Sequence, residues 1–354
     1  MLQDSAQAFL RAHHSVRRAR TYRQSGTGFD PDFWAQLAQV GWLTMRMPET
    51  LGGTGLSIAE VAIVARELGV HGVADPIVMA AMVPSAILAV VPRSAAAARL
   101  ADTLVSGGST IAMMAGDLPL PVINGRLSAR LPVYSLAPRN TLCLLVEQAG
   151  VPAIVAVEDA RPGVSLIRQP HDDGSVSGRV NLDGVSIAPP DSLLHDGAAL
   201  AIWRGAMHEG LIALSAQLTG VTQALLQMTL AYVKQRVQFG QAIGTFQVIQ
   251  HRLVDLNNAV RLAGASCGRA VREHLAAPGR AAVPVHAAKA RCSGTASDVA
   301  CGALQLHGAM GYTDECDLAV FFRAATVLAQ TMGNATWHRH ALWQRLLAME
   351  PDHG

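Results

Sequence analysis

Residues 236–251 bring together residue types that can bind a nucleotide. They read Arg-Val-Gln-Phe-Gly-Gln-Ala-Ile-Gly-Thr-Phe-Gln-Val-Ile-Gln-His, with a cation, an amide, an aromatic ring and a glycine in the first five positions. The guanidinium of Arg236 can hold a phosphate through two parallel hydrogen bonds, and the ring of Phe239 offers a surface for an adenine. The alternative is a polar corner between two helices, with Phe239 and Phe246 in the core. Taken alone, the stretch is compatible with both interpretations.

A helix is expected to begin inside this stretch. Thr245 has the side chain of an N-cap, so Phe246 and Gln247 would lie in the first turn. Gln247, His251 and Asp255 are spaced four apart and would share one helix face. The spacing therefore predicts polar groups close to a helix end.

A second segment, residues 305–315, has glycines between two expected helices. It reads Gln-Leu-His-Gly-Ala-Met-Gly-Tyr-Thr-Asp-Glu. At Gly308 and Gly311 the backbone can approach a ligand closely and direct N–H groups at a phosphate. A glycine that only ends a helix is the alternative.

Helices are expected before and after a β-rich middle. Asp30 followed by Pro31 predicts a capped helix start, and Ser57 with Glu60 predicts a capping box that opens a helix to Leu68. The glycine-rich loop before Ser57 fits neither nucleotide-binding fingerprint.

The middle of the chain has short β-rich runs separated by turn residues, including the hairpin signal Asn124-Gly125. We expect a small antiparallel barrel or sandwich there, with strands near residues 111–114, 141–146, 153–157 and 164–167. Four long helices are expected after it, at about 198–234, 245–275, 284–306 and 314–348. The predicted domains are 1–107, 108–192 and 193–354.

Composition limits the class of protein. Charged residues make up 15% and hydrophobic residues 50% of the 354 residues, which indicates helices buried on several faces and hence an oligomer. A net charge of +2 without a basic tract argues against nucleic-acid binding. Five scattered cysteines argue against a disulfide framework and a metal site and favour a cytoplasmic protein. The most apolar run, residues 73–91, is broken by Asp75, Pro76 and Pro84, so no membrane span is expected.

The two glycine-containing segments together resemble those of the acyl-CoA dehydrogenase flavoproteins, and the resemblance extends over essentially the whole chain. It implies a mainly α fold with an N-terminal helical domain, a middle β-domain and a C-terminal four-helix bundle. It also implies FAD, an acyl-CoA substrate, a tetramer, and an electron-transfer flavoprotein as electron acceptor. In the family these segments bind the ADP half of FAD in a neighbouring subunit. The implied cofactor-binding residues are Arg236, Gln238, Phe239, Phe246, Gln247, Gln305, Gly308 and Ala309.

The catalytic carboxylate of the family is not in its usual place. Many members have a glutamate a fixed distance after an arginine, and counting from Arg323 that position is Met332. A thioether cannot accept a proton at neutral pH, so Met332 is no general base. Other members place the glutamate on the first bundle helix, where this chain has Gly210 one residue past Glu209. Glu209 is therefore the alternative base only if that register is shifted by one residue.

The middle domain departs from the family as well. The chain lacks the Thr-Glu-Pro-x-x-Gly-Ser-Asp and Trp-x-Thr-Asn runs that contact the flavin ring and the acyl-CoA in the family. The corresponding stretch at residues 113–121 is shortened. Features that serve a neighbour's FAD are thus present, while those that serve the chain's own flavin are missing.

Three hypotheses follow. The first is a subunit of a heteromeric (α2β2) acyl-CoA dehydrogenase whose paralogous partner supplies the glutamate, with a bulky acyl group such as a steroid side chain as substrate. The second is a self-sufficient homotetramer that uses Glu209 or a reaction without a carboxylate. The third is a non-catalytic scaffold or regulatory paralogue.

Overall fold

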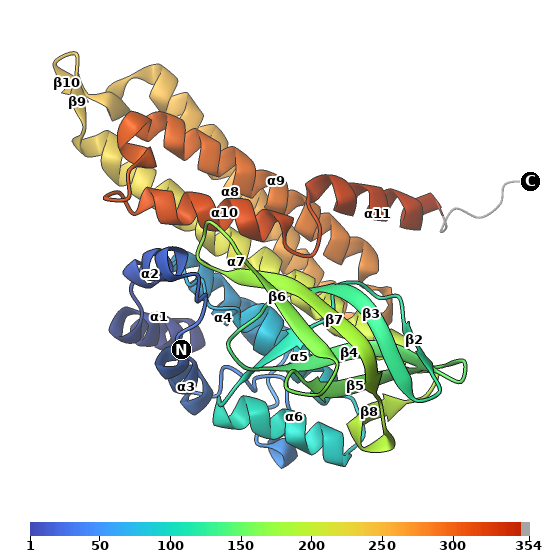
Figure 1. Ribbon diagram of the computed structural model, residues 1–354. Helices are drawn as coiled ribbons and strands as arrows, with labels where there is room; N and C mark the ends of the chain where they lie inside the picture. The colour runs from blue at the N-terminus through green and yellow to red at the C-terminus, as the bar shows by residue number, and fades with distance from the viewer. Residues whose placement is uncertain (348–354) are drawn as a thin grey trace, which may run out of the picture. The chain divides into compact units, whose positions relative to one another are not determined.

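Helices, then strands, then helices follow one another along the chain, as the resemblance implies (Figure 1). The computed structural model describes residues 1–347. The mainly helical fold with a middle β-sheet is confirmed. The chain forms two compact units: one contains Met1–Arg20, Ala62–Val73 and the chain from Leu211 on, and the other contains Thr21–Val61 and Ala74–Gly210.

The N-terminal helices begin where their capping residues predict. The Asp30 carboxylate accepts hydrogen bonds from the N–H groups of Asp32 and Phe33, and Pro31 is the first residue of α3. The Glu60 side chain accepts from the Ser57 N–H, which is one half of the predicted capping box; the Ser57 hydroxyl accepts from the N–H of Ala59 rather than that of Glu60. The helices are α1 (Leu2–His13), α2 (Arg17–Ser25), α3 (Pro31–Gln39), α4 (Ile58–Val70), α5 (Val83–Leu88) and α6 (Ala95–Ser106).

The middle sheet has the order β6-β7-β3-β2-β4-β5-β8, with β1 beside β4. Asn124 and Gly125 have φ of 50° and 71° and join β2 to β3, as their turn preference predicts. The expected antiparallel pairing is wrong at two places, because β1 and β2 both run parallel to β4. The strands are β1 (Thr110–Met113), β2 (Leu120–Ile123), β3 (Arg126–Val133), β4 (Asn140–Gln148), β5 (Val151–Glu158), β6 (Val164–Pro170), β7 (Val176–Ser186) and β8 (Ser192–His195).

The C-terminal helices run side by side in Figure 1, and the fourth expected helix is two helices. A turn at residues 331–334 separates them, so the prediction of one helix over 314–348 is wrong; residues 348–354 lie outside the described residues. The helices are α7 (Ala199–Gln235), α8 (Gln247–Ala276), α9 (Ala282–His307), α10 (Leu318–Gln330) and α11 (Ala335–Leu347).

The longest helix, α7, is a core helix. Of the described helices it alone is long and apolar enough to cross a membrane, yet 78% of its most apolar window is buried within the protein. At Gly220 it crosses α4 so closely that an added Cβ would lie 2.0 Å from the carbonyl oxygen of Arg66. Only glycine permits that approach.

Candidate functional site

The two glycine-containing segments meet at one end of the bundle. Tyr232, near the end of α7, stacks on His307, the last residue of α9, with ring centroids 4.3 Å apart and planes inclined by 21°. A hairpin of β9 (Val237–Gln238) and β10 (Gln241–Ala242) follows α7, and the 3-10 helix η6 (Gly308–Tyr312) follows α9. The contact between Tyr232 and His307 therefore brings the starts of both segments together.

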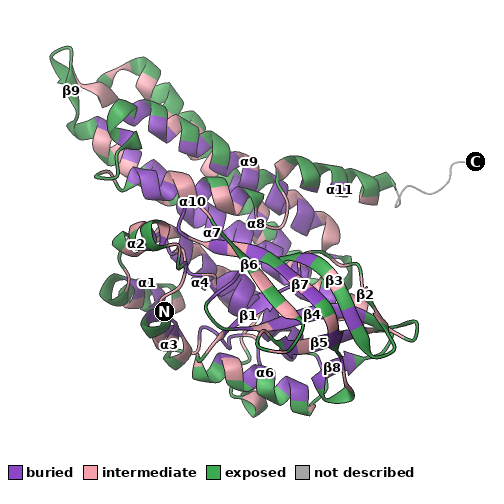
Figure 2. Cartoon of the chain, in the orientation of Figure 1, coloured by how far each residue is buried: buried purple, intermediate pink, exposed green. Residues whose placement is uncertain are grey.

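The hairpin presents the candidate nucleotide ligands to solvent (Figure 2). Phe239 is 92% exposed, at a φ of 54° that few non-glycine residues adopt. Its ring meets that of half-buried Phe246 edge-on, with centroids 6.2 Å apart. The alternative of Phe239 as a core residue is therefore wrong. Arg236 is exposed, and no other residue among 1–347 engages its guanidinium.

The start of α8 differs from the expectation in one respect. The N-cap is Phe246, and the Thr245 hydroxyl donates back to the carbonyl of Ala242 at 2.7 Å, so Thr245 is not the cap. The preceding 3-10 helix Ile243–Thr245 uses this hydroxyl instead. Gln247 is the first residue of α8 and is exposed.

The remaining candidate ligands are exposed as well. Gln305 lies in the last turn of α9, and the side-chain amide of Gln238 donates to its neighbour's carbonyl at 2.8 Å. Gly308 and Ala309 follow α9 directly. Gly308 has φ 63° and ψ −148°, a conformation essentially reserved for glycine.

Sequence reasoning missed Tyr232 and His307. The His307 Nδ1 lies 2.8 Å from the carbonyl oxygen of Ala303, and since a carbonyl only accepts, Nδ1 carries the proton. Burial lowers the pKa of His307, so the ring is neutral at pH 7. No spacing rule marks a contact between two helix ends 75 residues apart.

The donor set at this bundle end suits the ADP half of FAD. It offers a cation for the diphosphate, an exposed ring for the adenine, amides, and backbone N–H groups beside a glycine. The side chains in this set are exposed, so packing of the bundle does not require them.

The middle-domain loop after β1 is held by the chain itself. Trp203 is fully buried and donates from Nε1 to the carbonyl of Gly116 at 2.9 Å. Arg204 pairs with Asp117 at 2.7 Å. The Gly116 carbonyl and the Asp117 carboxylate are thus engaged by α7.

Met332 lies in the turn between α10 and α11. It is half-buried, with φ 58°, and Gly333 follows at φ 102°. Asn334 caps α11 through a 2.9 Å hydrogen bond from the N–H of Trp337. A polar pocket of about 180 Å³ borders the turn. Its lining residues are Ser293, Ser297, Ala329, Gln330, Asn334, Ala335 and Thr336.

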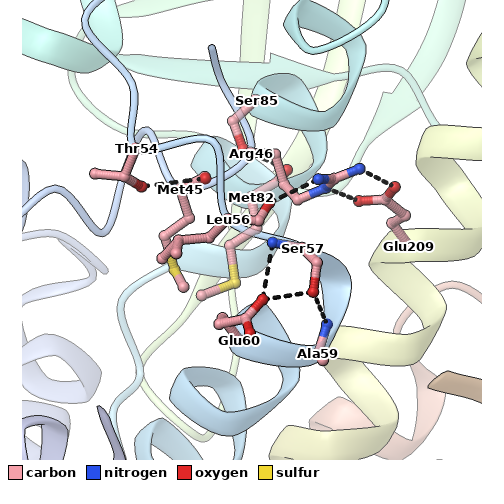
Figure 3. Close-up of polar contacts among 10 residues, drawn as sticks. All are labelled: Met45, Arg46, Thr54, Leu56, Ser57, Ala59, Glu60, Met82, Ser85 and Glu209. Atoms are coloured by element: carbon pink, nitrogen blue, oxygen red, sulfur yellow. Dashed lines mark hydrogen bonds and ion pairs between the residues drawn. The ribbon is translucent and has the colours of Figure 1, made fainter. Parts of the chain in front are cut away.

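Glu209 is engaged by Arg46 (Figure 3). Arg46 donates from Nε to Oε2 at 2.7 Å and from Nη2 to Oε1 at 2.9 Å, and from Nη1 to the carbonyl of Leu56 at 2.6 Å. Glu209 is 9% exposed. A bidentate guanidinium stabilises the carboxylate form, which weakens it as a proton acceptor.

Comparisons with known proteins agree with this architecture. The family description "Acyl-CoA dehydrogenase, N-terminal domain" matches residues 1–98, and "Acyl-CoA dehydrogenase, C-terminal domain" matches residues 195–347. The acyl-CoA dehydrogenase IpdE2 of Mycobacterium tuberculosis is 30% identical, and the alignment covers 94% of this chain and 92% of that protein.

Two solved structures share the fold. The ChsE4-ChsE5 complex of Mycobacterium tuberculosis matches with a TM-score of 0.87 and 24% identity, over 99% of this chain and 97% of that chain. A variant of the Tcur3481-Tcur3483 steroid ACAD matches with a TM-score of 0.84 and 23% identity, over 98% and 97%. The chain belongs to the acyl-CoA dehydrogenase family, whose members bind FAD.

Proposed function

We propose that this chain is one subunit of a heteromeric acyl-CoA dehydrogenase whose paralogous partner supplies the catalytic glutamate and most of the flavin pocket. One contrast carries the proposal. Groups suited to the ADP half of FAD are complete and exposed at the bundle end, while Met332 stands where the family has its carboxylate. Glu209, the alternative base, is held by Arg46.

The reaction forms a double bond between the α and β carbons of an acyl-CoA thioester. A carboxylate of the partner takes the α-proton, and FAD, when bound, accepts the hydride that leaves the β-carbon. Arg236 would bind the diphosphate, Gln238 and Phe239 would line the adenosine, and the backbone N–H of Ala309 would supply a donor; the Gly308 N–H caps α9 by donating to the Leu304 carbonyl. An electron-transfer flavoprotein is the proposed electron acceptor.

The proposed substrate is an acyl-CoA with a large polycyclic acyl group. Two structural neighbours support the assembly and the substrate class. One is the two-subunit ChsE4-ChsE5 complex, and the other is named as a steroid ACAD. Turnover of a panel of steroid and straight-chain acyl-CoA thioesters is the direct assay of the substrate class.

Co-expression with the paralogous partner tests the assembly. We expect an α2β2 complex with one FAD for every two chains, measured as flavin absorbance against protein mass. A homotetramer of this chain alone with one FAD per chain would overturn the proposal.

A self-sufficient enzyme of the same fold is the second candidate. The observation that favours it is the polar pocket beside the Met332 turn, which has hydroxyl and amide side chains able to hydrogen-bond a ligand. Turnover by the purified single chain that is lost in Glu209→Gln would establish this candidate.

A further inference from the structure

Lys289 is fully buried on α9, and its amine caps the carbonyl end of α10. Its Nζ lies 3.2 and 3.4 Å from the carbonyl oxygens of Ala329 and Leu328, 3.0 Å from that of Gly333, and 2.8 Å from the Ser293 hydroxyl. None of the carboxylates in residues 1–347 pairs with it. The last carbonyls of a helix have no intrahelical partner and carry partial negative charge, so they take the place of a counter-ion.

Two histidines hold the other side of the same turn. His338 is fully buried on α11, and its Nε2 lies 3.1 Å from the carbonyl oxygen of Met332. Since a carbonyl only accepts, Nε2 carries the proton. Burial, and then the nearby Lys289 ammonium, lower the pKa of His338 to about 4, so its Nδ1 is a lone-pair acceptor. His286 Nδ1, 2.8 Å away, must therefore be the donor of that contact.

The charged and titratable groups around the amine are few. On α9 the buried Cys292 thiol acts on Lys289, and on α11 His338 faces it, with Arg345 acting on His338. The α10 contacts are backbone carbonyls. Burial lowers the pKa of Lys289 to about 7, while its four acceptors favour the protonated form.

The hydrogen bonds that Lys289 and His338 make to residues 332 and 333 are to backbone oxygens. Lys289 binds Gly333 and His338 binds Met332, so the left-handed backbone at 332 is held independently of the side chain there. A non-glycine residue at positive φ persists only where its surroundings fix it.

We propose that Lys289 and His338 are positioning residues for residue 332, and that they keep a turn able to present a carboxylate although this chain carries methionine. The inference rests on the proposed function only in that Met332 leaves this chain's own site without a base. On this inference only the side chain at position 332 prevents the site from having a base, because the hydrogen bonds that hold the turn's backbone are intact.

Amide hydrogen exchange across residues 331–336 tests the positioning without any substrate, in the purified complex. We expect Lys289→Met and His338→Phe to speed exchange in this segment at least about tenfold, because each removes a hydrogen bond to a partly buried backbone oxygen of the turn. His338→Gln, which retains an N–H donor, should restore most of the protection. Lys234→Met, at the exposed lysine of α7, is the matched control and should leave amide exchange across residues 331–336 unchanged.

Equal exchange in Lys289→Met, His338→Phe and the wild type would overturn the inference. The pair His338→Phe and His338→Gln remains decisive if Lys289→Met does not fold. A finding of one FAD per chain would contradict the proposed function but would not affect the conclusion from the exchange measurements.

A second measurement tests the carboxylate. In a complex whose partner's glutamate is replaced by glutamine, and in which dialysis shows acyl-CoA bound at this chain's own site, Met332→Glu should exchange the α-proton of that acyl-CoA with deuterated water. Met332→Gln should not. Adding Lys289→Met to Met332→Glu should lower that exchange at least about tenfold, since misplacing a base by about 1 Å has that effect or more. Absence of exchange in Met332→Glu with the turn protected would overturn the claim that the turn can present a base.

Discussion

Arg46 holds both carboxylate oxygens of Glu209, at 2.7 and 2.9 Å. Two parallel charge-assisted hydrogen bonds fix the carboxylate in its ionised form and occupy an oxygen lone pair on each side. Arg46 is in turn anchored by the Leu56 carbonyl, so the pair is part of the loop that precedes α4. The geometry favours a structural role for Glu209 over a catalytic one.

Removal of Arg46 should destabilise the protein more than neutralisation of Glu209. Arg46→Met leaves a carboxylate that is 9% exposed without its cation, which should lower the free energy of unfolding by about 1–3 kcal/mol. Glu209→Gln keeps an acceptor for Arg46 and should lower it by less. Urea denaturation of the two variants measures the difference. Turnover of the heteromeric complex should be unchanged in Glu209→Gln, and its loss would assign the base to this chain.

Exposed residues at the hairpin should affect FAD and not folding. Arg236→Ala should weaken FAD binding to the complex about 10- to 100-fold, the effect of one lost charge-assisted contact to a phosphate. Phe239→Ala should weaken it less, because a stacked ring is replaced by solvent. Neither change should alter the unfolding midpoint of the apoprotein, since both side chains are exposed.

Equilibrium dialysis of flavin against the complex gives the affinities. Arg252→Ala is the matched control, because Arg252 is an exposed arginine on the neighbouring helix α8. Equal loss of affinity in Arg252→Ala and Arg236→Ala would mean that net charge, and not a phosphate contact, governs binding.

Local signals in the sequence predicted the element starts well. Asp30, Ser57 with Glu60, and Asn124-Gly125 each act within a few residues, so the chemistry that fixes them is visible in the chain. The missed strand β7 alternates buried and exposed residues, but Gly178 and Gly184 interrupt its apolar pattern. Gly178 is required there, because a Cβ would lie 2.2 Å from the carbonyl oxygen of Ile167.

Contacts between distant residues decided what the sequence did not predict. Residues 314–348 were expected to form one helix, and the turn at Met332 interrupts it through backbone hydrogen bonds to Lys289 and His338. The candidate FAD residues are brought to one bundle end by the stack of Tyr232 on His307. The high exposure of Phe239 decided between a ligand-binding ring and a core residue, and exposure depends on the whole fold.

Gly308 should be intolerant of a side chain for backbone reasons alone. An added Cβ would meet no atom within 4 Å, so the cost of Gly308→Ala comes from its φ of 63° and ψ of −148°. We expect a loss of about 1–3 kcal/mol in the free energy of unfolding, or a shift of the backbone that lowers FAD affinity. Gly205→Ala on α7 also meets no atom within 4 Å and should be neutral or stabilising by about 0.5–1 kcal/mol. Equal behaviour of the two variants in thermal unfolding and flavin titration would contradict the assigned strain.

The stability of the protein should rise with pH just above neutrality because of Lys289. Its pKa is about 7 in the folded state against 10.5 for a free side chain, so between these values the unfolded chain binds more protons than the folded one. The free energy of unfolding therefore increases with pH from about 7, and the cost of burying the charged amine is fully present below that pH.

The pH window for this effect ends near pH 8.5, where cysteine thiols exposed by unfolding begin to ionise and reverse the trend. Urea denaturation of the apoprotein at pH 6.5, 7.5 and 8.2 should show a steeper rise in the wild type and in Lys234→Met than in Lys289→Met, which keeps only the rise near pH 6.5 from the buried histidines. A wild-type profile no steeper than that of Lys289→Met would mean that the amine stays protonated throughout, held by its carbonyl and hydroxyl acceptors.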